Sequence, residues 1–347
     1  MSRPLALAAA ALALLLAARA GAAAGGAYTT ILLYHRVGEA AHPTTSIPVA
    51  AFRAQMQWIA DHGLRVIPLS RLARALEQGE PPPPRSVVIT FDDTYRSIYT
   101  QAAPLLAAHR FPYTLFVYTE ALERGYPDFM SWEELRELAA RPGVEIGNHG
   151  HRHRHLVGDP AWEAHLRRDL TTAARLLKER LGVTPTCFAA PYGEYTPESE
   201  ALARQLGYRV QLTQDRGSVG PETPPWRLPR NAMVGGRGTV TAPVEAVNEP
   251  PLPWAERYPS VGRLPSPELA EVGIRLRHPE RYWPGQVNLF LSELGRLEAR
   301  FDPASGWLRA RVARRLVRHT DRITASARRR SDDRWALVSW RVVVPGR

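Results

Sequence analysis

The sequence predicts an α/β domain, built as a distorted (β/α) barrel, followed by a small all-β domain that resembles a sandwich. The first observation is the alternation of strand-like and helix-like segments over residues 28–235, which is typical of a mostly parallel sheet, open or closed into a barrel. The second is the presence of polar side chains directly after four of the strand-like segments. The third is a change in composition near residue 235, beyond which short strands and turns recur about every ten residues.

Hydrophobic periodicity identifies the elements of the first domain. The run TILLYH (30–35) is apolar, as a buried strand is, whereas AFRAQMQWIAD (51–61) has apolar residues at helical spacing. The clearest buried strand is SVVITFDD (86–93), which is β-branched and then abruptly acidic. The expected elements, in chain order, are strand 30–35, helix 51–61, strand 65–70, helix 70–79, strand 86–93, helix 96–109, strand 113–118, helix 131–140, strand 144–148, helix 160–181, strand 186–191, helix 197–206 and strand 208–213.

Residues 245–347 are expected to form the all-β domain. The connecting stretch that begins VGGRGTVTAP is rich in Gly, Pro and Val and has no helical period. Segments such as QVNLFLS and RWALVSWRVVV have the pattern of strands, and DPASG (302–306) is a hairpin-type turn. We find no catalytic constellation in this part of the sequence, and we expect a small antiparallel sandwich.

The first 24 residues have the pattern of a secretory signal peptide, assigned to residues 1–24. Arg3 precedes an apolar run from Pro4 to Ala18, and small residues with A-x-A spacing follow. The run is shorter than the roughly 20 residues that span a bilayer, although an uncleaved anchor is an alternative. The mature protein is therefore expected to be exported, to the periplasm or outside the cell. Cys187 is the single cysteine, so no intramolecular disulfide can form.

The net charge of +11 raises the question of an anionic partner. Lys178 is the only lysine, and such an arginine bias is more often the mark of a GC-rich genome than of a selected surface. A basic charge can indicate binding to the phosphates of nucleic acids. Because of the arginine bias, we nevertheless expect no nucleic-acid ligand. Arginines gather late in the chain, at 314–315 and 328–330. We interpret them as solvated strand faces; peripheral contact with an anionic polymer, a membrane or the cell envelope is the alternative.

The segment NHGHRHRH (148–155) indicates a metal site. A hydrolytic metal centre typically has three protein ligands and an open position, which one aspartate and two histidines would supply. His149 follows a strand, and His153 would point the same way if the chain enters a helical turn there. His151 and His155 have the same spacing, so that pair stays open, as does an exposed polar loop. In TFDD, one carboxylate can bind a metal while its neighbour accepts a proton, although an ordinary acidic turn would look the same.

Three motifs in combination resemble the polysaccharide deacetylases, carbohydrate esterase family 4, which share the NodB-homology domain. The motifs are TFDD after a buried strand, EIGNHGHRHRHL, and FAAPYGEY. ILLYHRVGE near the expected mature N-terminus resembles the branch that deacetylates poly-N-acetylglucosamine. The resemblance covers residues 28–235 and implies a deacetylase domain there. Each motif alone is unspecific, and their order and combination carry the resemblance.

The resemblance implies a role for each matched residue. Asp92 would be the general base, and Asp93 would be a metal ligand. His149 and His153 match the family's H-x-x-x-H and would complete the ligand set. The backbone N–H of Tyr192 would help to stabilise an oxyanion.

The Pro-Tyr-Gly motif, from Pro191 to Gly193, would border the substrate. Many family members carry an arginine two residues before this proline, which orients the general base. This chain has Ala189 at that position, so another group must hold Asp92. Nothing in the motif itself says which group that is.

The general acid is the second departure from the family pattern. Many members use a late-chain histidine, whereas the histidines after His165 lie only in the expected β domain. His35, which ends the first strand, is the expected substitute through a circularly permuted motif order. A purely structural histidine at a strand end is the alternative. Asp215 and Arg230 lie where partner residues are expected, and the sequence assigns them no firm role.

These expectations define a metal-dependent hydrolase that removes N-acetyl groups from an acetylated polysaccharide containing N-acetylglucosamine, of the poly-β-1,6-linked kind. The ion is expected to be Zn2+, and Co2+, Ni2+ or Fe2+ would suit the mixed nitrogen and oxygen ligands. An O-acetyl esterase acting on xylan is the alternative within the same chemistry. A non-catalytic carbohydrate-binding protein is the alternative from another class. The sequence carries no signal for an oligomeric state.

Overall fold

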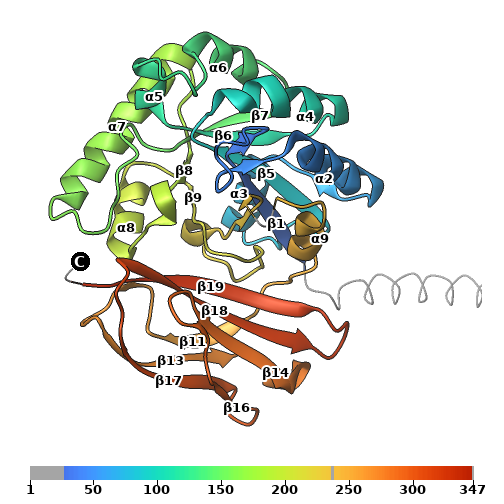
Figure 1. The fold of residues 1–347 in the computed structure, drawn as a ribbon, viewed down its shortest axis with the longest axis vertical. Helices are drawn as coiled ribbons and strands as arrows, with labels where there is room; N and C mark the ends of the chain where they lie inside the picture. The colour runs from blue at the N-terminus through green and yellow to red at the C-terminus, as the bar shows by residue number, and fades with distance from the viewer. Residues whose placement is uncertain (1–26, 236–237, 346–347) are drawn as a thin grey trace, which may run out of the picture.

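The computed structural model describes residues 27–235 and 238–345 and divides them into two parts of different architecture. A curled parallel sheet covered by helices forms the upper part of Figure 1, and two antiparallel sheets form the lower part. This arrangement confirms the expected α/β domain followed by an all-β domain. The signal peptide expected over residues 1–24 lies outside the described residues. Among the helices of the described ranges, none has the length and hydropathy that crossing a membrane requires.

The first part is built on an eight-stranded sheet in which every paired strand runs parallel to its neighbour. The strand order is β10-β1-β5-β6-β7-β8-β9, and β4 pairs with β5. Every residue of β1 and β5 is buried, as expected of a parallel sheet with both faces covered. The strands are β1 (Thr29–Tyr34), β4 (Arg65–Val66), β5 (Ser86–Asp92), β6 (Tyr113–Val117), β7 (Val144–Asn148), β8 (Cys187–Ala189), β9 (Val210–Leu212) and β10 (Asn231–Ala232).

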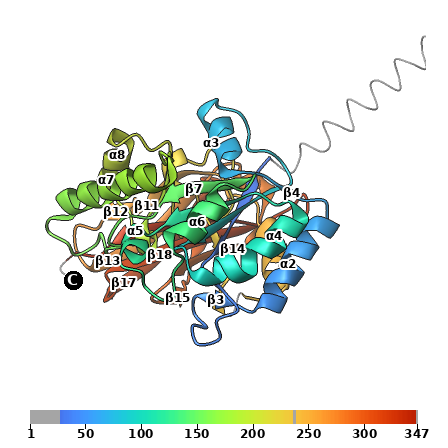
Figure 2. The ribbon, with the colours of Figure 1, turned by 90° about the horizontal axis from the view of Figure 1, so that it is seen from above.

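Helices connect these strands and cover the sheet, with α2 and α4 side by side on one flank and α7 and α8 on the other (Figure 2). The expected strand over 65–70 was wrong beyond Val66, because helix α3 begins at Leu69 with Pro68 as its N-cap residue. The helices are α2 (Val49–Asp61), α3 (Leu69–Glu77), the π-helical turn η2 (Ile98–Ala102), α4 (Ala103–His109), α5 (Thr119–Glu123), α6 (Trp132–Ala139), α7 (Trp162–Leu181), α8 (Pro197–Gln205) and α9 (Thr241–Val247).

The short segment 228–232 lies between the two ends of the curled sheet. On the β9 side, the Leu228 N–H donates to the Gln211 carbonyl at 3.0 Å, and the Thr213 N–H donates to the Leu228 carbonyl at 2.9 Å. On the other side, Asn231 and Ala232 pair with β1. One stretch of backbone thus bonds to both edges, which makes the sheet a distorted barrel.

The second part is a sandwich of two mainly antiparallel sheets. Their strand orders are β11-β13-β17-β16 and β12-β19-β18-β14-β15. Ile274, Leu289, Leu308 and Trp340 lie in the core that the two sheets share, and the turn expected at 302–306 joins β16 to β17. The strands are β11 (Trp254–Tyr258), β12 (Gly262–Arg263), β13 (Glu268–Leu276), β14 (Tyr282–Leu291), β15 (Gly295–Arg296), β16 (Arg300–Asp302), β17 (Trp307–Arg315), β18 (Thr320–Arg329) and β19 (Trp335–Val343).

Helix α9 packs with the parallel-sheet part. It contacts β1 and α2, and Ala242 and Ala246 are buried in the same core as Phe52. Residue 245, the expected start of the β domain, therefore falls inside α9. We propose that the domain boundary lies after Val247, between this helix and β11.

Candidate metal and catalytic site

The side chains expected to carry chemistry all follow the carboxyl ends of parallel strands. His35 follows β1, Asp92 ends β5, His149 follows β7, and the Pro191–Gly193 turn (η3) follows β8. Because parallel strands end at the same edge of the sheet, these residues meet at one end of the distorted barrel. The charges of Asp92, Asp93 and His149 all act on His35, which places the first strand's histidine at the same centre.

Asp93, His149 and His153 form a compact triangle of ligand atoms. The Asp93 Oδ1 atom lies 3.3 Å from the Nε2 atoms of both histidines, which are 3.1 Å from each other. Ligands placed about 2.0–2.1 Å from a tetrahedral zinc ion are separated by about 3.3 Å. The Asp93 Oδ1 atom is buried, and it accepts no hydrogen bond from the described residues. The three side chains therefore fit a divalent ion.

The ring of His149 is oriented for this role. Its Nδ1–H donates to the Ala189 carbonyl at 2.8 Å, so in the neutral ring Nε2 is the unprotonated nitrogen, and it is directed toward Asp93. Burial opposes the charged form of the imidazole, but Asp92, Asp93 and the Ala189 carbonyl together raise its pKa. Burial likewise raises the pKa of Asp93, but the adjacent imidazoles of His149 and His153 hold it well below its ordinary value.

Four non-glycine residues at this site have left-handed backbone conformations. Asp93, Thr94, His153 and Tyr192 have φ angles of 70°, 63°, 49° and 57°. The turn at Asp93 and Thr94 directs the adjacent carboxylates of Asp92 and Asp93 toward His149, although neighbours on a straight strand would point to opposite faces. Such conformations cost of order 1–3 kcal/mol each and persist where surrounding contacts impose them.

The chain from His149 to His155 is a loop, so the expected helical turn was wrong. Gly150 has a φ of 84°, and the Arg152 N–H donates to the Asp169 Oδ1 atom at 2.6 Å. This folded loop, rather than helical i,i+4 spacing, brings His153 back toward His149. A Cβ on residue 150 would lie 2.2 Å from the Asp169 Oδ2 atom, so this position requires glycine.

The other two histidines of the run point elsewhere. The His151 Nδ1 atom is 3.0 Å from the Thr119 hydroxyl. His155 stacks on the Tyr192 ring at 3.6 Å between centroids, and its Nδ1 atom is 2.9 Å from Glu194. The structure thus brings together His149 and His153, and it separates the alternative pair.

Arg230 is the residue that sequence reasoning left without a role. Its Nη1 and Nη2 atoms donate to the two oxygens of Asp92 at 2.7 and 2.8 Å, and neither side chain is exposed. Its Nε atom donates to the Thr213 carbonyl at 2.8 Å. Burial raises the pKa of Asp92, but Arg230 and the nearby imidazoles outweigh burial and hold the pKa below its ordinary value. Arg230 thus holds Asp92 in place, as the arginine expected from the family pattern at position 189 would do.

The pairing of Arg230 with Asp92 could not be recognised from the sequence pattern. Arg230 lies in the barrel-closing segment 228–232, directly before β10, but a two-residue strand has too short a pattern to recognise. Asp215, also left without a role, accepts a hydrogen bond from the Tyr195 hydroxyl at 2.5 Å. Its backbone carbonyl accepts from the Arg230 N–H, so Asp215 supports the segment.

His35 is half-buried beside the carboxylates, and its Nδ1 atom has no hydrogen-bond partner among the described residues. Burial is the main cause that lowers its pKa, although Asp93 and Asp92 act in the opposite direction. The imidazole therefore gives up a proton more readily than an exposed histidine does.

In the Pro-Tyr-Gly turn, the Gly193 N–H donates to the Ala190 carbonyl, and the Glu194 N–H donates to the Pro191 carbonyl. Neither bond uses the N–H of Tyr192. The Tyr192 ring lies 4.6 Å from the His153 ring, so this turn borders the triangle.

A second group of possible ligands, formed by Glu39, His42 and Asp128, differs in character. The guanidinium of Arg36 pairs with both carboxylates of this group. A cation already neutralises the acids, and the group carries no metal proposal.

Comparison with known proteins agrees with this geometry. Residues 79–211 match the family model described as polysaccharide deacetylase. The chain is 26% identical over 212 residues to the poly-beta-1,6-N-acetyl-D-glucosamine N-deacetylase of Escherichia coli (strain K12), a match that covers 50% of this chain and 31% of that protein. It is 25% identical over 194 residues to the protein of the same name from Staphylococcus aureus (strain MRSA252), covering 53% of this chain and 67% of that one.

The fold also has a solved counterpart. The Streptococcus pyogenes deacetylase PplD, determined in complex with acetate, superimposes with a TM-score of 0.58 at 21% identity. That superposition covers 64% of this chain and 99% of PplD, so the similarity lies in the barrel part of the molecule. The family match over residues 79–211 and the relatives agree with the resemblance carried by the three motifs, and the solved counterpart shares the fold. Residues 79–211 are thus similar to a polysaccharide deacetylase domain.

Proposed function

We propose that this chain is a metal-dependent N-deacetylase that hydrolyses acetamido groups on a polysaccharide containing N-acetylglucosamine, of the poly-β-1,6-linked kind. One observation carries the proposal: a buried carboxylate held by an arginine lies beside an Asp–His–His triangle at the strand ends. The carboxylate can act as a base and the triangle can hold a cation. Hydrolysis of an amide by water uses both functions.

Asp92 is the proposed general base. Because its pKa is held below the ordinary value, the carboxylate is ionised at neutral pH and can accept the proton of the attacking water. Both oxygens accept hydrogen bonds from Arg230, which fixes the plane of the carboxylate. Arg230 is thus a positioning residue for the base.

Asp93, His149 and His153 are the proposed metal ligands, and zinc suits their mixture of nitrogen and oxygen donors. When bound, a divalent ion supplies polarisation of the acetyl carbonyl and a lowered pKa for water. The Ala189 carbonyl keeps His149 in the tautomer that such binding requires.

Tyr192 and His35 complete the proposed mechanism. The Tyr192 N–H donates a hydrogen bond to the oxygen that gains negative charge when water adds to the carbonyl. His35 donates a proton to the sugar nitrogen as the C–N bond breaks, and acetate and a glucosamine unit are released. The lowered pKa of His35 makes its protonated form the stronger acid.

The substrate class comes from the relatives. Those in E. coli and S. aureus are named for poly-beta-1,6-N-acetyl-D-glucosamine, and we propose a polymer of the same kind for this chain.

The test is acetate release from N-acetylglucosamine oligomers and from acetylated xylan, with metal stripped and then restored. We expect release from the oligomers that disappears on stripping and returns with Zn2+. Asp92→Asn should abolish release and keep the metal, whereas the control Asp61→Asn, at an exposed position on α2, should behave as wild type. Faster release from xylan would instead support an O-acetyl esterase. Metal binding without release from either substrate would support a carbohydrate-binding protein.

A further inference from the structure

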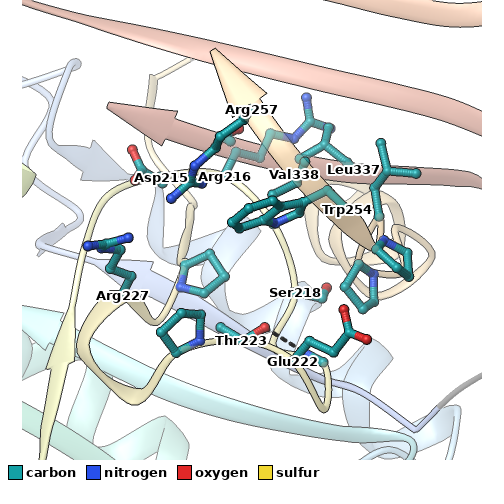
Figure 3. Close-up of a pocket in the computed structure, with 18 of the residues that line it drawn as sticks. Asp215, Arg216, Ser218, Glu222, Thr223, Arg227, Trp254, Arg257, Leu337 and Val338 are labelled. Atoms are coloured by element: carbon teal, nitrogen blue, oxygen red, sulfur yellow. Dashed lines mark hydrogen bonds between the residues drawn. The ribbon is translucent and has the colours of Figure 1, made fainter. Parts of the chain in front are cut away.

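A pocket lies where the two parts of the molecule meet (Figure 3). Loop residues between 215 and 224, together with Arg227, form the wall on the deacetylase side. Trp254 and Arg257 of β11 and residues 337–339 of β19 form the opposite wall. The pocket leaves about 710 Å³ unfilled by protein atoms, open solvent at its mouth included. None of the proposed ligands or catalytic residues lines it.

The walls of this interdomain pocket are mainly rigid and apolar. The Trp254 indole lies at the centre of the view in Figure 3, between the proline-rich loop and the β domain. Proline rings have no rotamer freedom to lose when a ligand binds, and flat rings suit the flat apolar face of a sugar. The lining prolines are Pro221, Pro224, Pro229, Pro251 and Pro253.

Arg257 differs from the other arginines of the pocket in its partners. Its guanidinium lies over the Trp254 ring at 4.3 Å and 5.5 Å from the Trp340 ring. Among the described residues, no hydrogen bond or ion pair to Arg257 is found. The other two arginines of the lining do have acidic partners: Arg227 pairs with Glu200, and Arg216 pairs with Glu249.

Asp215 and Glu222 also line the pocket, but neither forms an ion pair with Arg257. Keeping the guanidinium here without a directly bonded anion costs free energy, because it is partly removed from water. Burial is the main cause that lowers the pKa of Arg257 to about 10; Arg227 repels the guanidinium further, while Tyr195, Asp215 and Glu200 oppose the lowering without outweighing burial. A carboxylate ligand would relieve this cost, since the two-pronged guanidinium matches carboxylate geometry. The group that would complete the pocket is therefore an anion that pairs with Arg257 and has a flat apolar face to pack on Trp254 and the prolines.

We propose that the interdomain pocket binds a carboxylate-bearing sugar unit of the polysaccharide, with Arg257 as the partner of the carboxylate and Trp254 as the stacking surface. The sugar class rests on the proposed function. The consequence for specificity is that, among polymers with β-1,6-linked N-acetylglucosamine, the chain prefers those that also carry acidic sugar units. Arg257 would then hold the polymer at a second point, outside the hydrolytic site.

The test measures binding of methyl glucuronide, methyl glucoside and inorganic phosphate to the full chain by calorimetry, with no turnover required. The glucuronide is expected to bind at least tenfold more tightly than the glucoside, which differs only in lacking the carboxylate, and more tightly than phosphate. Equal binding of the glucoside would overturn the role of the guanidinium. Phosphate that binds as tightly as the glucuronide would overturn the role of the sugar ring.

Arg257→Gln should weaken glucuronide binding at least tenfold. The matched control is Arg309→Gln, since Arg309 also lies 4.3 Å over a tryptophan, Trp307, but on an exposed face and outside this pocket. Unchanged binding by Arg257→Gln, or an equal loss in the control, would overturn the proposal. Arg257→Lys keeps the charge but not the fork, and its expected several-fold loss provides the same test if the glutamine variant does not fold.

Turnover separates this inference from the proposed function. Arg257→Gln should leave acetate release from neutral N-acetylglucosamine oligomers unchanged, while it raises the KM, not the kcat, for an N-acetylated polymer that contains uronic acid. A chain that binds the glucuronide but releases no acetate contradicts the deacetylase proposal alone. A chain that releases acetate but does not bind the glucuronide contradicts the pocket proposal alone.

Discussion

Replacing Arg230 by methionine would remove the partner of a fully buried carboxylate. Arg230 donates two hydrogen bonds to Asp92, at 2.7 and 2.8 Å, and neither side chain is exposed. Breaking a buried pair from one side typically costs about 3–5 kcal/mol, because the remaining charge loses its partner. The variant is therefore expected to lose a large part of its unfolding free energy. Bound metal should stay, since no side chain of the triangle contacts Arg230 directly.

The pH dependence of this loss has a definite sign. In the native chain the pKa of Asp92 is lowered, so its stabilising contribution is present above the unfolded pKa of about 3.9 and is lost as pH falls through the folded value. In Arg230→Met, burial raises the pKa against weaker opposition, and folding then favours the protonated carboxyl group. The variant should lie closest to wild type in acid and fall further below it as pH rises toward neutrality.

The assay is urea denaturation of both proteins from mildly acidic to neutral pH, with acetate release measured on the same samples. Release should fall about 10²–10⁴-fold, the usual contribution of a general base, and its acidic limb should move to higher pH. Arg230→Met combined with Asp92→Asn should regain stability, because removing both members of a buried pair costs less than removing one. Arg209→Met, which breaks the exposed pair with Glu77, should cost about 1 kcal/mol or less. Wild-type activity and stability in Arg230→Met, or no recovery in the double variant, would refute the reasoning.

Metal analysis should show that His149→Ala loses most of its bound metal while His151→Ala keeps it; an equal loss in both would contradict the choice of His149 over His151 as a metal ligand. His35→Gln should keep its metal but slow acetate release about 10²–10⁴-fold. In wild type, release should decline as pH rises through the lowered pKa of His35, and a decline that persists unchanged in the variant would remove His35 as the acid. Gly150→Ala, whose Cβ would meet an aspartate oxygen at 2.2 Å, should lower metal affinity and stability more than Gly182→Ala, which has a φ of 74° and no neighbour within 4 Å. Equal effects measured by denaturation and metal titration would mean that only backbone strain matters at residue 150.

The sequence was most informative where a local pattern and a global constraint coincide. Buried parallel strands have continuous apolar runs, and their carboxyl ends share one edge, so Asp92 and His149 could be placed at one end of the fold. The hairpin at 302–306 and the alternation of helices and strands were predictable for the same reason, because each depends on neighbours in the chain. The position of Pro68 shows the limit of this approach, since a helix began where apolar residues suggested a strand.

The sequence by itself determined which functional groups follow the successive strands: a histidine, two carboxylates, a histidine run and a Pro-Tyr-Gly turn. Tertiary structure alone decided which atoms meet. Arg230 reaches Asp92 across 138 residues of chain only because a two-residue strand closes the curled sheet. His153 returns to His149 through a loop that depends on Gly150 and Asp169, not on helical spacing. Contacts of this kind depend on packing between distant segments, which leaves no periodic trace in the sequence.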